Sequence, residues 1–106
     1  MSVSVSEKSE LKDYVNAFYS IVGRTWTTDL NDEAANVFYI MLTEAAECSG
    51  AMDWVPRAPI PGGVNVKWLL KNLRRSLINA MRDKFYTICV QRTIGNWDTT
   101  LRIKCL

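Results

Sequence analysis

A chain of 106 residues with 48% hydrophobic side chains is long enough to bury one core, so we expect a single domain over residues 1–106. The net charge of +2 hides an uneven distribution, because residues 1–63 carry nine acidic and four basic side chains whereas residues 64–106 carry two acidic and nine basic ones. Such a division indicates either that the two halves neutralise each other or that a charged surface is kept for a partner.

Residue types that catalytic and metal sites require are missing or badly spaced. The sequence has no histidine, which is the usual general base near neutral pH and the commonest metal ligand. Its three cysteines are too few and too widely spaced for a zinc site, and no glycine-rich nucleotide-binding motif occurs. We therefore expect no enzyme activity, no metal and no cofactor.

The sequence shows no sign of a targeting or membrane segment. Its first ten residues lack the basic and apolar regions of a signal peptide, and no apolar run is long enough to cross a bilayer. An odd number of cysteines without a CxxC pair is typical of free thiols in a reducing compartment. We expect a cytoplasmic protein that does not contact a membrane.

Two amphipathic helices are expected in the first half of the chain. Residues 7–22 repeat apolar side chains every three or four positions, and Gly23 follows as a suitable helix end. Residues 31–49 repeat the pattern, with Asn31 as the expected N-cap. A tight link would make these two helices an antiparallel pair. Residues 2–6 alternate serine with valine, which indicates either a short strand or a frayed end.

A proline-rich segment separates these helices from the next one. Residues 51–63 contain all three prolines, which excludes a regular helix, yet Met52, Trp54 and Ile60 are too apolar to be left in water. We expect an extended crossover that covers the core, and the alternative for this segment is a binding loop. A third helix, with an apolar face and an opposite basic face, is expected over residues 65–83.

The last 22 residues predict a β-hairpin. Residues 85–94 and 97–106 are rich in β-branched and aromatic side chains, and Gly95 and Asn96 between them suit a tight turn. Pairing the two arms about this turn places apolar side chains on one face and polar ones on the other, and a shift of one residue would mix them. The expected fold is therefore α+β, with three helices, a crossover and a C-terminal hairpin that buries one face.

The expected hairpin also determines what we expect of the cysteines. Cys89 and Cys105 would lie on opposite faces of the hairpin, and Cys48 would face the helical core, so no disulfide is expected. On the polar face Cys89 would lie beside Arg102, and a basic neighbour favours the thiolate.

Two charged surfaces are candidates for partner binding, although both are also what ordinary solvated faces look like. A basic stripe on the third helix has the charge to contact phosphates or an acidic protein, with a tryptophan at its edge for stacking on bases; it comprises Lys67, Lys71, Arg74, Arg75, Arg82 and Trp68. An acidic surface on and around the second helix has the charge to cover a basic enzyme cleft; it comprises Asp29, Asp32, Glu33, Glu44, Glu47 and Asp53.

These features together predict a noncatalytic protein-binding module, of the kind that neutralises a partner enzyme as an inhibitor, immunity protein or antitoxin does. The alternative is a small nucleic-acid-binding protein that uses the basic face of the 65–83 helix. A pI of about 8.5 and the lack of a nucleic-acid-binding motif favour the protein partner.

Overall fold

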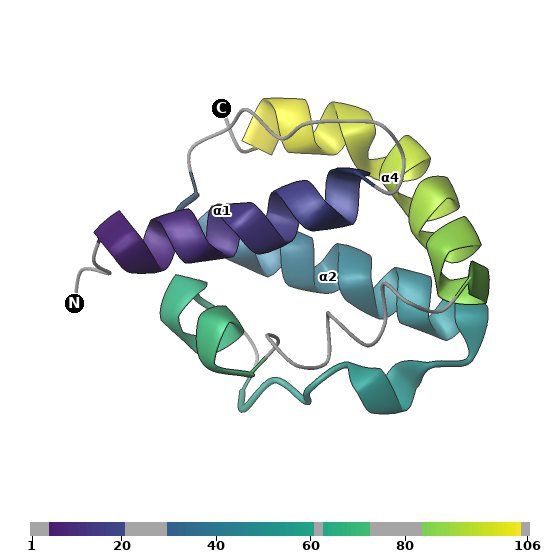
Figure 1. Ribbon diagram of the computed structural model, residues 1–106, viewed down its shortest axis with the longest axis horizontal. Coiled ribbons are helices and arrows are strands. Elements are labelled where there is room, and N and C mark those ends of the chain that lie inside the picture. Colours follow the sequence, from purple (N-terminus) through teal and green to yellow (C-terminus); the bar gives the residue numbers. More distant parts are fainter. Residues whose placement is uncertain (1–4, 21–29, 61–62, 73–83, 105–106) are drawn as a thin grey trace.

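The described part of the chain is helical. The computed structural model describes residues 5–20, 30–60, 63–72 and 84–104. Within these ranges the chain forms no strand. Its helices include α1 (Val5–Ser20), α2 (Asp32–Ser49), the short 3-10 helix η1 (Met52–Trp54) and α4 (Lys84–Lys104). Residues 66–72 are helical as well, and Figure 1 shows them beside α1 and α2. The radius of gyration is 12.6 Å, which is that of a compact domain of this length.

The ends of α2 follow from local sequence signals. The Oδ1 atom of Asn31 accepts a hydrogen bond from the backbone N–H of Ala34 at 2.8 Å, which confirms the expected N-cap. Gly50 ends the helix with a φ of 74°, a left-handed conformation that glycine adopts at little cost. The expected bounds of 31–49 therefore agree with the observed helix to within one residue.

Helix α2 lies at the centre of the core. Eight of its side chains are buried, and Phe38 meets Phe18 of α1 edge to face, with ring centroids 5.2 Å apart and an interplanar angle of 89°. Both α1 and α2 run in the same direction across Figure 1, so they do not form the antiparallel pair that a tight link would give. The remaining core side chains of the described residues come from α1, Leu30, residues 64–70 and α4.

The expected α+β fold is wrong, because the predicted hairpin is one continuous helix. Residues 84–104 form α4, and Gly95 lies within it instead of in a turn. Among residues 85–97 of α4, whose burial is described, the buried side chains recur every three or four positions, which is the period of a helix lying along one core face; they are Tyr86, Cys89, Val90, Thr93 and Ile94. Ile88, expected inside, is 46% exposed, while Thr93, expected outside, is buried. Burial of this helical stripe overrides the strand preference of the individual residues.

The expected absence of a disulfide is wrong for the same reason. Cys48 at the end of α2 and Cys89 in α4 are joined by a disulfide, with Cα atoms 5.8 Å apart. The expected burial of the two cysteines is also reversed. Cys48, expected in the core, is exposed, and Cys89, expected on the polar face, is 1% exposed. Arg102 is thirteen residues from Cys89 along the helix, or about 20 Å, so it is not the expected neighbour.

The other predicted elements are matched in part. Helix α1 includes Val5, so that residue belongs to a helix and not to a strand; residues 2–4, and 21 and 22 at the expected helix end, lie outside the described residues. The proline-rich segment has no regular α-helix or strand over residues 51–60, as expected, although η1 forms one turn within it. Of the expected third helix, residues 66–72 are helical and residues 73–83 lie outside the described ranges.

Candidate functional site

An open, mostly apolar hollow lies where the proline-rich segment crosses α2. Its volume is about 430 Å³. The described residues that line it come from α2, the crossover and the chain just before residues 66–72; they are Asn36, Tyr39, Ile40, Arg57, Ala58, Pro59, Ile60 and Val64. Sequence reasoning named this segment as a cover for the core and did not find the hollow. The sequence signal that pointed to it was an apolar residue, Ile60, between two prolines. In the structure Ile60 is 65% exposed instead of buried.

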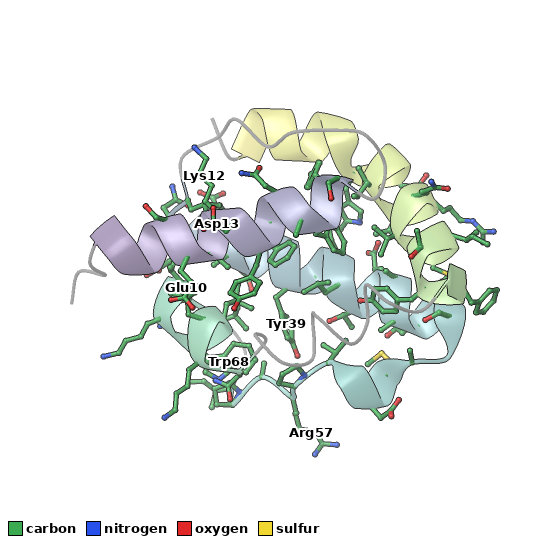
Figure 2. All side chains as sticks on the ribbon, in the orientation of Figure 1. Glu10, Lys12, Asp13, Tyr39, Arg57 and Trp68 are labelled. Atoms are coloured by element: carbon green, nitrogen blue, oxygen red, sulfur yellow. A yellow bond between two sulfur atoms is a disulfide. The ribbon has the colours of Figure 1, made fainter. Side chains whose placement is uncertain are left out.

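Tyr39 holds the walls of the hollow together. Its hydroxyl donates a hydrogen bond to the carbonyl of Pro56 at 2.6 Å and accepts one from the N–H of Ala58 at 3.1 Å. The ring of Tyr39 meets the ring of Trp68 edge to face, with centroids 5.4 Å apart. Figure 2 shows Tyr39 reaching from α2 toward the segment that carries Arg57, with Trp68 to its side. One side chain therefore links α2, the crossover and residues 66–72.

A backbone hydrogen bond next to the hollow joins Ile60 to Gly63, at a position that favours glycine. The N–H of Gly63 donates to the carbonyl of Ile60 at 2.9 Å. A Cβ atom at position 63 would lie 2.8 Å from Cγ1 of Ile60 and 3.1 Å from its carbonyl oxygen, which is closer than atoms normally approach. The chain is then anchored again where Asp32 Oδ1 accepts a hydrogen bond from the N–H of Val66 at 3.3 Å. The hollow is thus built by the fold and does not depend on a ligand for its shape.

The chemistry of the hollow is apolar with a positive edge. Arg57 is the charged residue among its described lining, and it is exposed, with its side chain pointing away from the body of the protein in Figure 2. Asn36 adds a neutral polar group. Such a surface suits an apolar group next to a carboxylate, because the guanidinium group forms strong, charge-assisted hydrogen bonds with carboxylates.

The predicted acidic surface is not brought together into one patch. Asp32 and Glu33 are exposed at the start of α2, whereas Glu44 and Glu47 are exposed near its end. Asp32 and Glu47 are fifteen residues apart, or about 22 Å along the helix axis. Exposed Asp53 lies in η1, beyond the end of α2, and the expected contribution of Asp29 lies outside the described residues.

Two acidic side chains of this predicted surface are also engaged within the protein. Asp32 accepts the hydrogen bond from Val66, and the carboxylate of Glu44 accepts a hydrogen bond from Nε1 of Trp97 in α4. These contacts join α2 to its neighbours, which gives both residues a structural role.

Only part of the predicted basic stripe falls within the described residues. Lys67 and Lys71 are exposed and lie one helical turn apart. Trp68 is partly buried and packs against Tyr39, so its ring contributes to the wall of the fold as well as to the surface. The other three members, Arg74, Arg75 and Arg82, lie outside the described residues.

A second surface that sequence reasoning missed lies on α4. Phe85 is 57% exposed and Ile88 is 46% exposed, and they are three positions apart on the helix. The expected hairpin placed Ile88 in the core, so this signal was hidden by the wrong secondary structure. Arg92 follows on the same side of the helix at the next turn, and its Nη1 atom lies 3.7 Å from Sγ of Cys48.

The described ranges contain neither of two other kinds of site. No group of three or more acidic or cysteine side chains converges there as metal ligands. No helix in those same ranges is both long and apolar enough to cross a membrane.

Comparison of the chain with protein-family models, with curated proteins and with solved structures found no match.

Proposed function

We propose that this chain is a noncatalytic protein-binding module, of the kind that neutralises a partner enzyme, and that the partner docks in the hollow beside Arg57. The observation that carries the proposal is the hollow itself, about 430 Å³ of mostly apolar surface with Arg57 at its edge. The partner contributes an apolar side chain that enters the hollow and an adjacent carboxylate that pairs with Arg57.

The shape of the hollow favours a protein over a small molecule. Pockets for small ligands enclose most of the ligand surface, whereas this hollow is open and its rim includes a largely exposed isoleucine, Ile60. A protein partner supplies the surface that covers such a rim and excludes water from the contact at its centre. Leaving Ile60 in water is unfavourable, and its burial by a partner removes that cost.

The rigidity of the hollow also supports binding. Tyr39 and the turn at Gly63 hold the walls in place before any partner arrives, so little conformational entropy is lost on association. The positive charge of Arg57 at the edge of the hollow supports an acidic partner segment.

The proposal is tested by comparing variants in capture of partners from an extract of the native host. Ile60→Asp and Arg57→Glu each change one lining residue of the hollow, while Phe85→Asp makes a similar change on an exposed side chain of α4. We expect the first two variants to lose the stoichiometric protein that the unchanged chain retains, and Phe85→Asp to keep it. With the purified partner, each hollow variant should weaken binding by about 2 kcal/mol, or roughly thirtyfold in Kd.

Other results would overturn this assignment. Retention of the partner by Ile60→Asp, with loss in Phe85→Asp, would move the interface to α4. Loss of the partner only in a variant with reversed charges at Glu44 and Glu47 would place the interface at the end of α2. Binding to generic DNA or RNA that weakens steeply with salt and survives both hollow variants would replace the proposal with nucleic-acid binding.

A further inference from the structure

The disulfide between α2 and α4 joins an exposed cysteine to a buried one. Cys48 is exposed at the end of α2, whereas Cys89 is 1% exposed in α4. The guanidinium group of Arg92, itself exposed, donates from Nη1 toward Sγ of Cys48 at 3.7 Å. An accessible disulfide sulfur next to a fixed positive charge differs from a purely structural crosslink, which is normally buried and unreactive.

We propose that Cys48 is a site of thiol–disulfide exchange with small thiols that carry carboxylate groups. The incoming thiolate attacks Sγ of Cys48, a new sulfur–sulfur bond forms between them, and the bond between Cys48 and Cys89 breaks. The electron pair of that bond leaves with Cys89 as a thiolate, which takes a proton from water. The product is a mixed disulfide on Cys48 and a free thiol on Cys89, with no net oxidation or reduction.

Access determines which sulfur is attacked. A thiolate must approach its target sulfur directly, and the core that surrounds Cys89 blocks that approach. Cys48 is exposed, and the neighbour recorded at its sulfur is the guanidinium group of Arg92, which is itself exposed. Attack at Cys48 leaves Cys89 positioned to act as the resolving thiol, because return of its thiolate to Cys48 expels the small thiol and restores the crosslink.

Charge determines which thiols react fastest. Arg92 lies within about 4 Å of the attacked sulfur and attracts the carboxylates of an incoming anionic thiol. One favourable contact between unit charges at this distance in water corresponds to roughly a fivefold gain in rate. A thiol without carboxylates carries negative charge only on its attacking sulfur, so it lacks this additional gain. The reaction opens the covalent link between α2 and α4 without requiring any other part of the fold to move first.

The experiment uses the full chain carrying Cys105→Ser, which removes the third cysteine from the readout. The oxidised protein is treated with reduced glutathione, an anionic thiol, or with mercaptoethanol, a neutral one, and acid-quenched samples are analysed by peptide mass spectrometry. We expect the adduct on Cys48. Arg92→Gln should slow formation of the glutathione adduct by roughly fivefold more than it slows the mercaptoethanol adduct, because both thiols attack as thiolates but only glutathione carries carboxylates. The matched variant Gln91→Ala should affect neither rate.

A second pair of variants covers the case in which the resolving thiol removes the adduct too quickly. In Cys89→Ala the thiol of Cys48 should react readily with oxidised glutathione, whereas in Cys48→Ala the buried thiol of Cys89 should react at least about tenfold more slowly. The proposal is wrong if the adduct forms on Cys89, if the two single-cysteine variants react equally fast, or if Arg92→Gln slows both thiols alike. It is also wrong if Cys48 and Cys89 are both free thiols in the protein prepared without reductant.

Discussion

Replacing Tyr39 with phenylalanine tests how the hollow is held in shape. The change removes one hydroxyl and with it two hydrogen bonds, to the carbonyl of Pro56 and from the N–H of Ala58. Each bond contributes about 1 kcal/mol, and water reaches part of this half-buried site, so we expect a loss of about 1–2 kcal/mol in the free energy of unfolding. The ring remains, so its edge-to-face contact with Trp68 is kept.

Two measurements check this expectation. Urea unfolding gives the change in stability, and Tyr14→Phe is the matched control, since Tyr14 is also partly buried against the core and should change by less than about 0.5 kcal/mol. Amide hydrogen exchange at Ala58 should quicken in Tyr39→Phe but not in the control, because that N–H loses its acceptor. Equal stability of the two variants, together with unchanged exchange at Ala58, would refute the role given to Tyr39.

Three further changes give separate expectations. Replacing Cys48 with alanine opens a crosslink between residues 41 positions apart, which should destabilise the protein by at most about 4 kcal/mol in thermal or urea unfolding, with no further loss on adding reductant. Burial raises the pKa of Tyr86, whereas in the unfolded chain its hydroxyl loses the proton near pH 10. The free energy of unfolding should therefore fall by about 1.4 kcal/mol for each pH unit above pH 10. Urea unfolding of Tyr86→Phe at several pH values should not show this fall. Asn31→Ala removes the N-cap of α2 and should cost about 1 kcal/mol, measured by the same unfolding assay, whereas Asn31→Asp should restore it.

Local signals made α2 predictable from the sequence. Asn31 caps its start, Gly50 ends it in a left-handed conformation, and the apolar pattern between them has a single period. Each of these signals acts within a few residues, so no knowledge of the rest of the fold is needed to interpret them. The same holds for the exclusion of regular helix from residues 51–60, which follows from the proline ring.

Helix α4 could not be predicted because two patterns compete in the same residues. Alternation and a central glycine indicated a hairpin, while Tyr86, Val90 and Ile94 also repeat at the spacing of a helix. The stripe facing the core includes Cys89 and Thr93, which are small or polar enough to look like surface residues in sequence. The core contributed by α2 determines the outcome, and that core is distant in sequence.

The hollow was beyond sequence reasoning for a similar reason. It depends on Tyr39 meeting residues seventeen and nineteen positions later, and neither the apolar character of Ile60 nor the prolines specifies that contact. The disulfide has the same origin, since Cys48 and Cys89 approach each other only because α4 is a helix that packs on α2. Sites made by long-range packing require the fold first.

The helical form of α4 also changes how the uneven charge of the two halves should be interpreted. Glu44 bonds Trp97, and Arg92 lies against Cys48, one residue from Glu47, so the acidic end of α2 lies beside the basic second half of the chain. One charged side chain from each half, Glu44 and Arg92, therefore takes part in the contact between α2 and α4. Arg57 stands apart from this contact, since it belongs to the acidic half of the sequence and lines the hollow. The positive charge of Arg57 therefore does not stabilise the packing of α2 on α4, and we propose that it binds an acidic partner.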